Sequence, residues 1–370
     1  MSIAIPAVTA LLALVFAILL VDQWRDRRHG FQLVWAVGML CFTVGSGAEA
    51  LAAAGGWTEP LYRAWYLGGA VLTAAWLGLG TAFLLGRTRF GYTYATLLLL
   101  SGLVALMIRN SPTYAGAGPL PYLYLLGAVV LAVAIFAASY FASDVWPRFA
   151  AAAIIAVTVL ATVLTIGMPA LAAPGYALSP ATGQPVGDAM PGYLRLLTPV
   201  MNIPGALSLL LGAVFSAYVF MPKRRVLPYS LDPTQPGDQF LFNLLIAPVA
   251  IAVNLAASLP AAARELVAGR LHSRVPATIL IALGAFFPTL TDSLNRAGST
   301  ELFALGKLAG VVFLLLGFLV SSEVFRDVRI PFTAIRLGSA WRERARRRDA
   351  VAAADVGAAP LVPVEDSPRG

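Results

Sequence analysis

Apolar stretches long enough to cross a bilayer recur along almost the whole 370-residue chain. A transmembrane helix needs roughly 20 consecutive apolar residues, and in lipid a helix satisfies its own backbone hydrogen bonds. Nine stretches fit: residues 3–21, 31–54, 62–86, 92–108, 120–142, 149–172, 196–221, 276–294 and 301–325. The sequence therefore predicts an all-α, polytopic helical membrane protein with about nine transmembrane helices and one further re-entrant or interfacial segment.

The composition excludes the ordinary soluble classes. Only 12% of the residues are charged and 59% are hydrophobic, whereas soluble domains carry about 25% charged residues. The net charge of +8 does not indicate nucleic acid, because the basic residues lie mainly between apolar stretches, where the positive-inside rule explains them. One cysteine and two histidines leave little material for a disulfide, a His-based metal site or a Ser-His-Asp triad. No catalytic residue, metal or cofactor is predicted.

Basic residues also predict the orientation. Met1 to Ile5 carry no Lys or Arg, and Arg25, Arg27 and Arg28 follow the first stretch, so we expect the N-terminus outside. Alternation then places residues 222–239 inside. The arginine-rich segment that follows the last stretch is expected inside as well, because it is strongly basic. An even number of crossings must separate these two basic regions. Three apolar stretches lie between them, so one of the three does not cross.

Of these three stretches, residues 240–258 are the one that the sequence predicts not to cross. They contain Pro248 and are expected to end at Ser258–Pro260. If they do not cross, 21 of the 26 Lys and Arg residues lie inside and four outside, with Lys307 inside a helix. We therefore expect nine crossings of the plasma membrane, with the C-terminus cytoplasmic. Whether residues 240–258 re-enter, lie at the interface or span stays open.

The chain divides into three predicted parts. Residues 1–325 form the transmembrane bundle, with residues 240–274 as a re-entrant or interfacial segment inside it. Residues 326–348 mix eight arginines with apolar residues, as a basic amphipathic helix does on the anionic lipid headgroups of the cytoplasmic face. Residues 349–370 are expected to be a disordered cytoplasmic tail.

Ionisable residues within apolar stretches are the candidate functional residues, because each costs about 2.5–3.5 kcal/mol to insert. Glu49, Arg63, Asp292 and Lys307 are all expected in the outer leaflet, and Asn202 at a similar depth. The first functional interpretation is a vestibule in which these five residues bind a small polar solute. In the alternative, Glu49 with Arg63 and Asp292 with Lys307 are ion pairs that only fix helix packing.

Two classes of function remain. The leading hypothesis is binding or transport of a small polar solute through the outer-leaflet cluster. The alternative is a non-catalytic membrane scaffold or sensor that acts through the basic C-terminal helix. An intramembrane enzyme is least favoured, because the sequence supplies few acid–base groups. The expected partners are the lipid bilayer, anionic lipid headgroups at the cytoplasmic face and a small polar solute.

Overall fold

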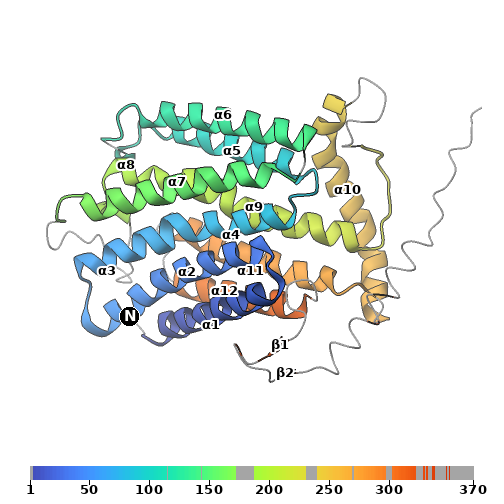
Figure 1. The fold of residues 1–370 in the computed structure, drawn as a ribbon, viewed down its shortest axis with the longest axis horizontal. Helices are drawn as coiled ribbons and strands as arrows, with labels where there is room; N and C mark the ends of the chain where they lie inside the picture. The colour runs from blue at the N-terminus through green and yellow to red at the C-terminus, as the bar shows by residue number, and fades with distance from the viewer. Residues whose placement is uncertain are drawn as a thin grey trace, which may run out of the picture. The chain divides into compact units, whose positions relative to one another are not determined.

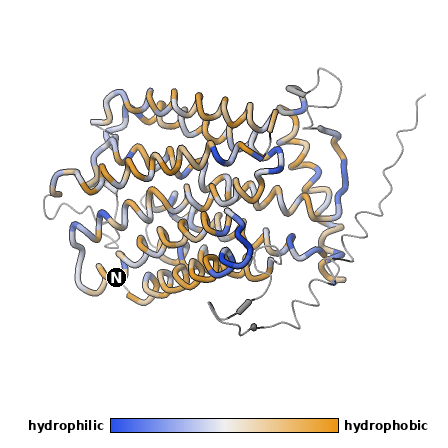
Figure 2. The backbone as a smooth tube through the Cα atoms, viewed as in Figure 1, coloured by the Kyte–Doolittle hydropathy of each residue, from blue (hydrophilic) through white to orange (hydrophobic). Residues whose placement is uncertain are grey.

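The computed structural model describes residues 3–114, 116–142, 144–171, 187–230, 240–268, 271–296 and 302–321, together with residues 328–329, 331, 336–337, 347 and 350. Within this described part of the chain, ten helices are long and apolar enough to span a membrane. The protein is therefore an all-helical, multi-pass membrane protein, as the sequence predicts (Figure 1). Hydrophilic residues gather in the connections, as in the turn between α1 and α2 (Figure 2).

The chain forms two compact units. Unit 1 comprises Met1–Phe215 and Ile279–Phe318, and unit 2 comprises Ser216–Thr278 and Leu319–Gly370. Helices α9 and α11 each begin in one unit and end in the other. The elements of unit 1 are α1 (Ala4–Arg27), α2 (Gly30–Gly55), α3 (Glu59–Ala64), η1 (Trp65–Leu72), α4 (Thr73–Leu84), α5 (Phe90–Met107), η2 (Pro112–Tyr114), α6 (Leu120–Phe141), α7 (Trp146–Gly167), η3 (Gly187–Ala189), α8 (Gly192–Arg195), most of α9 (Leu197–Phe220), most of α11 (Arg274–Arg296) and α12 (Phe303–Val320).

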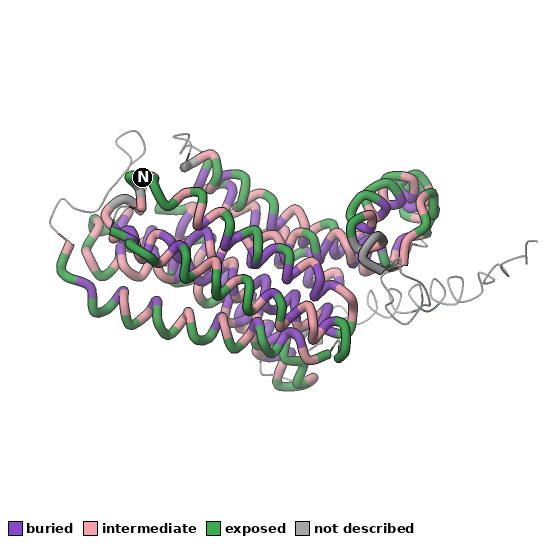
Figure 3. The backbone as a smooth tube through the Cα atoms, turned by 90° about the horizontal axis from the view of Figure 1, so that it is seen from above, coloured by how far each residue is buried: buried purple, intermediate pink, exposed green. Residues whose placement is uncertain are grey.

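Close helix contacts build the core of unit 1. Helix α1 packs along α2, α2 packs against η1 and α4, and α6 packs between α5 and α7. Buried residues follow the inner sides of these helices, while exposed apolar residues cover the outer sides (Figure 3). The buried Trp35 indole donates a hydrogen bond to the carbonyl of Leu77, 2.9 Å away, and so ties α2 to α4. Large apolar side chains on the outside are what a lipid-facing surface requires.

The third predicted stretch, residues 62–86, is not one regular α-helix. It consists of α3, then a π-helix, η1, and then α4, in an unbroken succession from Glu59 to Leu84. A π-helix bonds each N–H to the carbonyl five residues earlier, and it occurs mostly where function or packing requires a local change of side-chain direction. Helix propensity alone gives no signal for it, so the sequence did not reveal it.

Unit 2 contains residues 240–258, the apolar stretch that is predicted not to cross the membrane. Helix α10 (Phe240–Val267) runs through both Pro248 and Pro260, so the predicted end at Ser258–Pro260 is wrong. Its buried residues recur every three or four positions and form one stripe: Ala247, Ala250, Asn254, Ser258 and Ala262. Such a stripe identifies the side of α10 that packs against the rest of the unit. Whether α10 crosses the membrane stays a prediction at this point.

The C-terminal region is described at only a few residues. Two short strands, β1 (Val328–Arg329) and β2 (Arg336–Leu337), pair in antiparallel fashion. The expected helix over residues 326–348 is therefore not present at these four residues. Most other residues of that segment, and nearly all of the expected tail at 349–370, lie outside the described residues.

Candidate functional site

A buried ion pair joins two helices that are far apart in the sequence. The Lys307 ammonium on α12 contacts Oε2 of Glu49, which lies near the C-terminal end of α2. The Glu49 side chain is 0% exposed and that of Lys307 is 15% exposed. Buried charges are tolerated when they are paired and hydrogen-bonded. The pair also has no net charge.

Aromatic groups complete the surroundings of this pair. The Trp65 indole on η1 donates a hydrogen bond to Oε1 of Glu49 over 2.8 Å, so each carboxylate oxygen has its own donor. The Lys307 ammonium lies 4.3 Å from the centre of the Phe303 ring, within the range of a cation–π interaction. Trp57 and Tyr62 pack edge-on or tilted around Trp65. We call Glu49, Lys307, Trp65 and Phe303 the ion-pair centre.

Small residues explain how Glu49 and Trp65 come together. A Cβ atom added to Gly45 would lie 2.7 Å from the Cα of Gly69, so the backbones of α2 and η1 touch at this point. Glu49 follows Gly45 by four residues, and Trp65 precedes Gly69 by four. In two antiparallel helices these offsets lead in the same direction along the interface, and side chains four residues apart share one face. The glycine contact therefore sets the positions from which Trp65 reaches Glu49.

A second polar contact lies one helical turn further along η1. The Asn202 side chain on α9 donates to the carbonyl of Ala70 over 2.8 Å. Four residues earlier on α9, the Thr198 hydroxyl hydrogen-bonds the Tyr66 hydroxyl over 2.9 Å. Asn202 Oδ1 is buried and has no hydrogen-bond partner among the described residues. A buried acceptor without a donor costs free energy, which a bound donor would recover.

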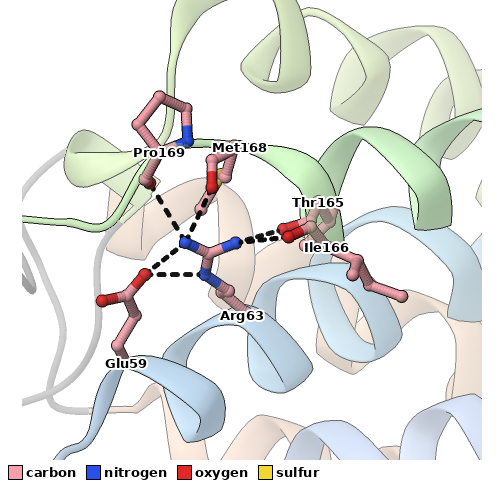
Figure 4. A network of polar contacts seen from close by, with 6 residues as sticks. All are labelled: Glu59, Arg63, Thr165, Ile166, Met168 and Pro169. Carbon is pink, nitrogen blue, oxygen red and sulfur yellow. Dashed lines mark hydrogen bonds and ion pairs between the residues drawn. The ribbon is translucent and has the colours of Figure 1, made fainter.

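Arg63 is fully occupied by the protein itself (Figure 4). Its Nε and Nη2 groups bond Glu59, four residues earlier on α3. Its remaining donors reach four carbonyls: those of Thr165 and Ile166 in the last turn of α7, and those of Met168 and Pro169 just after the helix. The last carbonyls of a helix lack intrahelical donors and carry partial negative charge. Arg63 therefore caps α7 and has no donor left for a ligand.

The pairs expected from the sequence are wrong. Lys307 pairs with Glu49 rather than Asp292, and Arg63 pairs with Glu59 rather than Glu49. Asp292 lies half-buried near the C-terminal end of α11. Of the five candidate residues, the structure joins Glu49 and Lys307 directly, and it places Asn202 against the same π-helix as Trp65. Trp65, which contacts Glu49, and Tyr66, which contacts Thr198, were not predicted from the sequence as candidate site residues.

Comparison with known proteins adds no family to this description. No protein-family model, curated protein or solved structure matches the chain. The candidate function must therefore rest on the ion-pair centre and its chemistry. The carboxylate and the ammonium of this centre are complementary to opposite charges on a ligand, and the unpaired Asn202 acceptor on α9 is complementary to a hydrogen-bond donor.

Proposed function

We propose that this protein binds and transports a small polar solute, and that Glu49, Lys307 and Asn202 provide its binding groups. The observation that carries the proposal is the buried Glu49–Lys307 pair between α2 and α12. Ionisable groups at membrane depth that face the interior of a helix bundle typically mark substrate or ion pathways. A solute with both a cationic and an anionic group would exchange contacts with both members of the pair.

The π-helix supports a transport step in this proposal. Trp65 and Ala70, both on η1, contact Glu49 and Asn202 respectively. Conversion of a π turn to an α turn shifts the register of the residues that follow. Trp65 is hydrogen-bonded to Glu49, so a solute that replaces Lys307 on Glu49 would change the surroundings of Trp65. This change would favour either the π-helical or the α-helical state of η1. Solute binding and helix geometry are coupled in this way, because a ligand shifts an equilibrium by its differential affinity for two states.

A stability screen tests this function. The purified protein in detergent is heated with small zwitterions, organic anions and organic cations, and a ligand at 100 times its dissociation constant should stabilise the fold by about 2.7 kcal/mol. Any such stabilisation should disappear in the Glu49→Gln/Lys307→Met double variant and remain in Gly47→Ala. Gly47 is a suitable control, since an added Cβ there meets nothing within 4 Å. A stabilising solute then enters a flux assay in proteoliposomes.

Two results would contradict the proposal. One is the absence of stabilisation by all three solute classes in the wild type. The other is a response that persists unchanged in the double variant, because the ion pair would then not be the binding site. The location that we propose is the plasma membrane, with the N-terminus outside and the C-terminus cytoplasmic.

A scaffold or sensor is the second candidate function, and the eight arginines of residues 326–348 favour it. A dense cationic segment beside the last helix suits an acidic protein partner as well as anionic lipid. Deletion of residues 326–370 distinguishes the two functions. Under the transport proposal the solute response survives the deletion, whereas a scaffold loses a co-purifying protein partner and never shows solute flux.

A further inference from the structure

The end of α9 and the start of α11 lie in contact within unit 2. The guanidinium carbon of Arg274 lies 4.1 Å from the centre of the Phe220 ring, and the His272 ring centre lies 5.0 Å from it. Met221 and Val275 share one buried apolar cluster with Ala262 of α10. If α9 and α11 both span, these ends lie on the same side of a hydrocarbon layer about 30 Å thick. Helix α10 separates them in the sequence, so it makes no net crossing.

The segment after α9 runs along the middle of α10. The Arg224 N–H donates to the Ser258 hydroxyl over 2.9 Å. The Val226 and Leu227 N–H groups donate to Asn254 Oδ1 over 2.7 and 2.9 Å, and the Asn254 amide donates back to the Leu227 carbonyl over 2.8 Å. Asn254 lies at the midpoint of Phe240–Val267.

This contact argues against a spanning α10. The midpoint of a spanning helix lies at the centre of the hydrocarbon, where exposed irregular backbone and exposed arginines are not tolerated. Arg224 and Arg225 are both exposed. Length and composition alone would allow residues 245–267 to span. The hydrogen bonds of the basic segment 223–227 to the middle of α10 favour a position at the interface instead. The exposed apolar side chains of α10 then enter the acyl region, as in interfacial helices: Leu245, Val249, Val253, Leu259 and Leu266.

Four cations lie at or near the C-terminal end of α9 in unit 2. The segment that is hydrogen-bonded to α10 carries three consecutive cations, Lys223, Arg224 and Arg225. A fourth cation, Arg274, lies beside Phe220. Residues 216–278 contain six Lys and Arg against three Asp and Glu. Desolvation, and then the neighbouring charge of Arg225, lower the pKa of Lys223. Burial raises the pKa of the Tyr229 phenol to about 12.

We propose that Lys223, Arg224, Arg225 and Arg274 form a binding site for the phosphate of an anionic phospholipid, on an α10 that lies at the membrane interface. Asn254 and Ser258 position the site, because they hold the backbone that carries three of the cations. An anion there relieves the repulsion between neighbouring cations. The membrane lipid is the favoured source of that anion, because the site directly follows the apolar end of α9 and has Tyr218 beneath Lys223, whose ammonium lies 5.9 Å from that ring. This inference is independent of the proposed solute site.

Native mass spectrometry in detergent tests the site with phosphatidylglycerol and phosphatidylcholine as probes. Wild-type protein should retain phosphatidylglycerol preferentially. Each cation near a charged membrane surface contributes about a fivefold preference, so Arg224→Gln/Arg225→Gln should lower phosphatidylglycerol retention by roughly 25-fold. The matched control is Arg87→Gln/Arg148→Gln, which removes the same charge from two exposed arginines of unit 1 and should leave retention within about twofold. Equal losses in both double variants would overturn the proposal.

Asn254→Leu separates a built site from general electrostatic attraction, because it changes no charge. The proposal expects this variant to lose most of the preference for phosphatidylglycerol, and unchanged retention in the folded variant contradicts the positioning role. If Asn254→Leu does not fold, Ser258→Ala takes its place. Competition with millimolar inorganic phosphate tests the source of the anion. Displacement of phosphatidylglycerol by free phosphate would overturn the assignment to a lipid.

Reporter fusions test the position of α10 directly. Fusions after Ser230 and after Gly269 flank this helix, and both should report the cytoplasm. Reports from opposite sides of the membrane would show that α10 crosses, and they would overturn the interfacial site together with the nine-crossing topology.

Discussion

Two groups of charged residues, one in each unit, differ in how the protein holds them. In unit 1, Glu49, Lys307 and Arg63 lie among helices, and each is engaged by other parts of the protein. In unit 2, Lys223, Arg224 and Arg225 are exposed, and the protein holds their backbone rather than their charges. A charge within apolar helices needs a protein partner, whereas a charge at the surface of the membrane can use lipid or water. The charges of unit 1 are therefore paired within the protein, whereas those of Lys223, Arg224 and Arg225 face outward.

The chain has two lysines, one in each unit, and they offer a matched pair of substitutions. Lys307→Met leaves the Glu49 carboxylate buried with Trp65 as its remaining donor. Loss of one member of a buried pair costs about 3–5 kcal/mol. We expect a large fall in the thermal unfolding temperature in detergent. Lys223→Met removes an exposed ammonium and should change stability by no more than about 0.5 kcal/mol. Similar losses in the two variants would remove the distinction between the units.

Arginine substitutions sharpen the same comparison. Arg63→Gln removes the guanidinium that caps α7 and leaves Glu59 without its ion pair. A hydrogen bond to a charged group contributes about 1.5–3 kcal/mol to stability. Two of the Arg63 donors share one acceptor, Oε1 of Glu59, so the contributions do not simply add. We expect the free energy of unfolding to fall by about 2–3 kcal/mol. Hydrogen exchange should also increase at the C-terminal end of α7. Arg225→Gln in unit 2 is the control, and it should leave both stability and exchange in α7 unchanged.

Backbone contact in unit 1 predicts a smaller effect. The Cβ of Gly45→Ala would overlap Gly69 on η1 and separate α2 from the π-helix. Overpacking typically costs about 1–3 kcal/mol, and here it also lengthens the Trp65–Glu49 hydrogen bond. Intrinsic tryptophan fluorescence should report the changed surroundings of Trp65. Gly47→Ala on the same helix meets open space and should be neutral or slightly stabilising. An equal effect of the two substitutions would exclude the proposed backbone contact.

The sequence predicts the helices well because their signal is local. Apolar length alone placed α2, expected at 31–54, within one residue of each observed end, Gly30 and Gly55. The same signal failed at Pro260, because a proline within apolar surroundings can be accommodated when neighbouring groups compensate for the lost hydrogen bond.

The candidate residues were predictable, but their partners were not. Insertion cost identifies Glu49 and Lys307 one residue at a time, whereas their contact spans 258 positions and depends on which helices are neighbours. The pairing of Arg63 with Glu59 has a signal in the sequence, since the two residues are four positions apart on one helix. The π-helix that presents Trp65 has no such local signal in the sequence.

A double-mutant cycle on Glu49 and Lys307 tests the central claim most directly. The free energy of unfolding is measured for the wild type, Glu49→Gln, Lys307→Met and the double variant under one set of detergent conditions. If the pair is formed in the folded protein, the double variant is more stable than Lys307→Met alone, and the coupling energy is at least about 1 kcal/mol. Strictly additive losses would show that the two charges do not interact, and the ion-pair centre would then not exist as described.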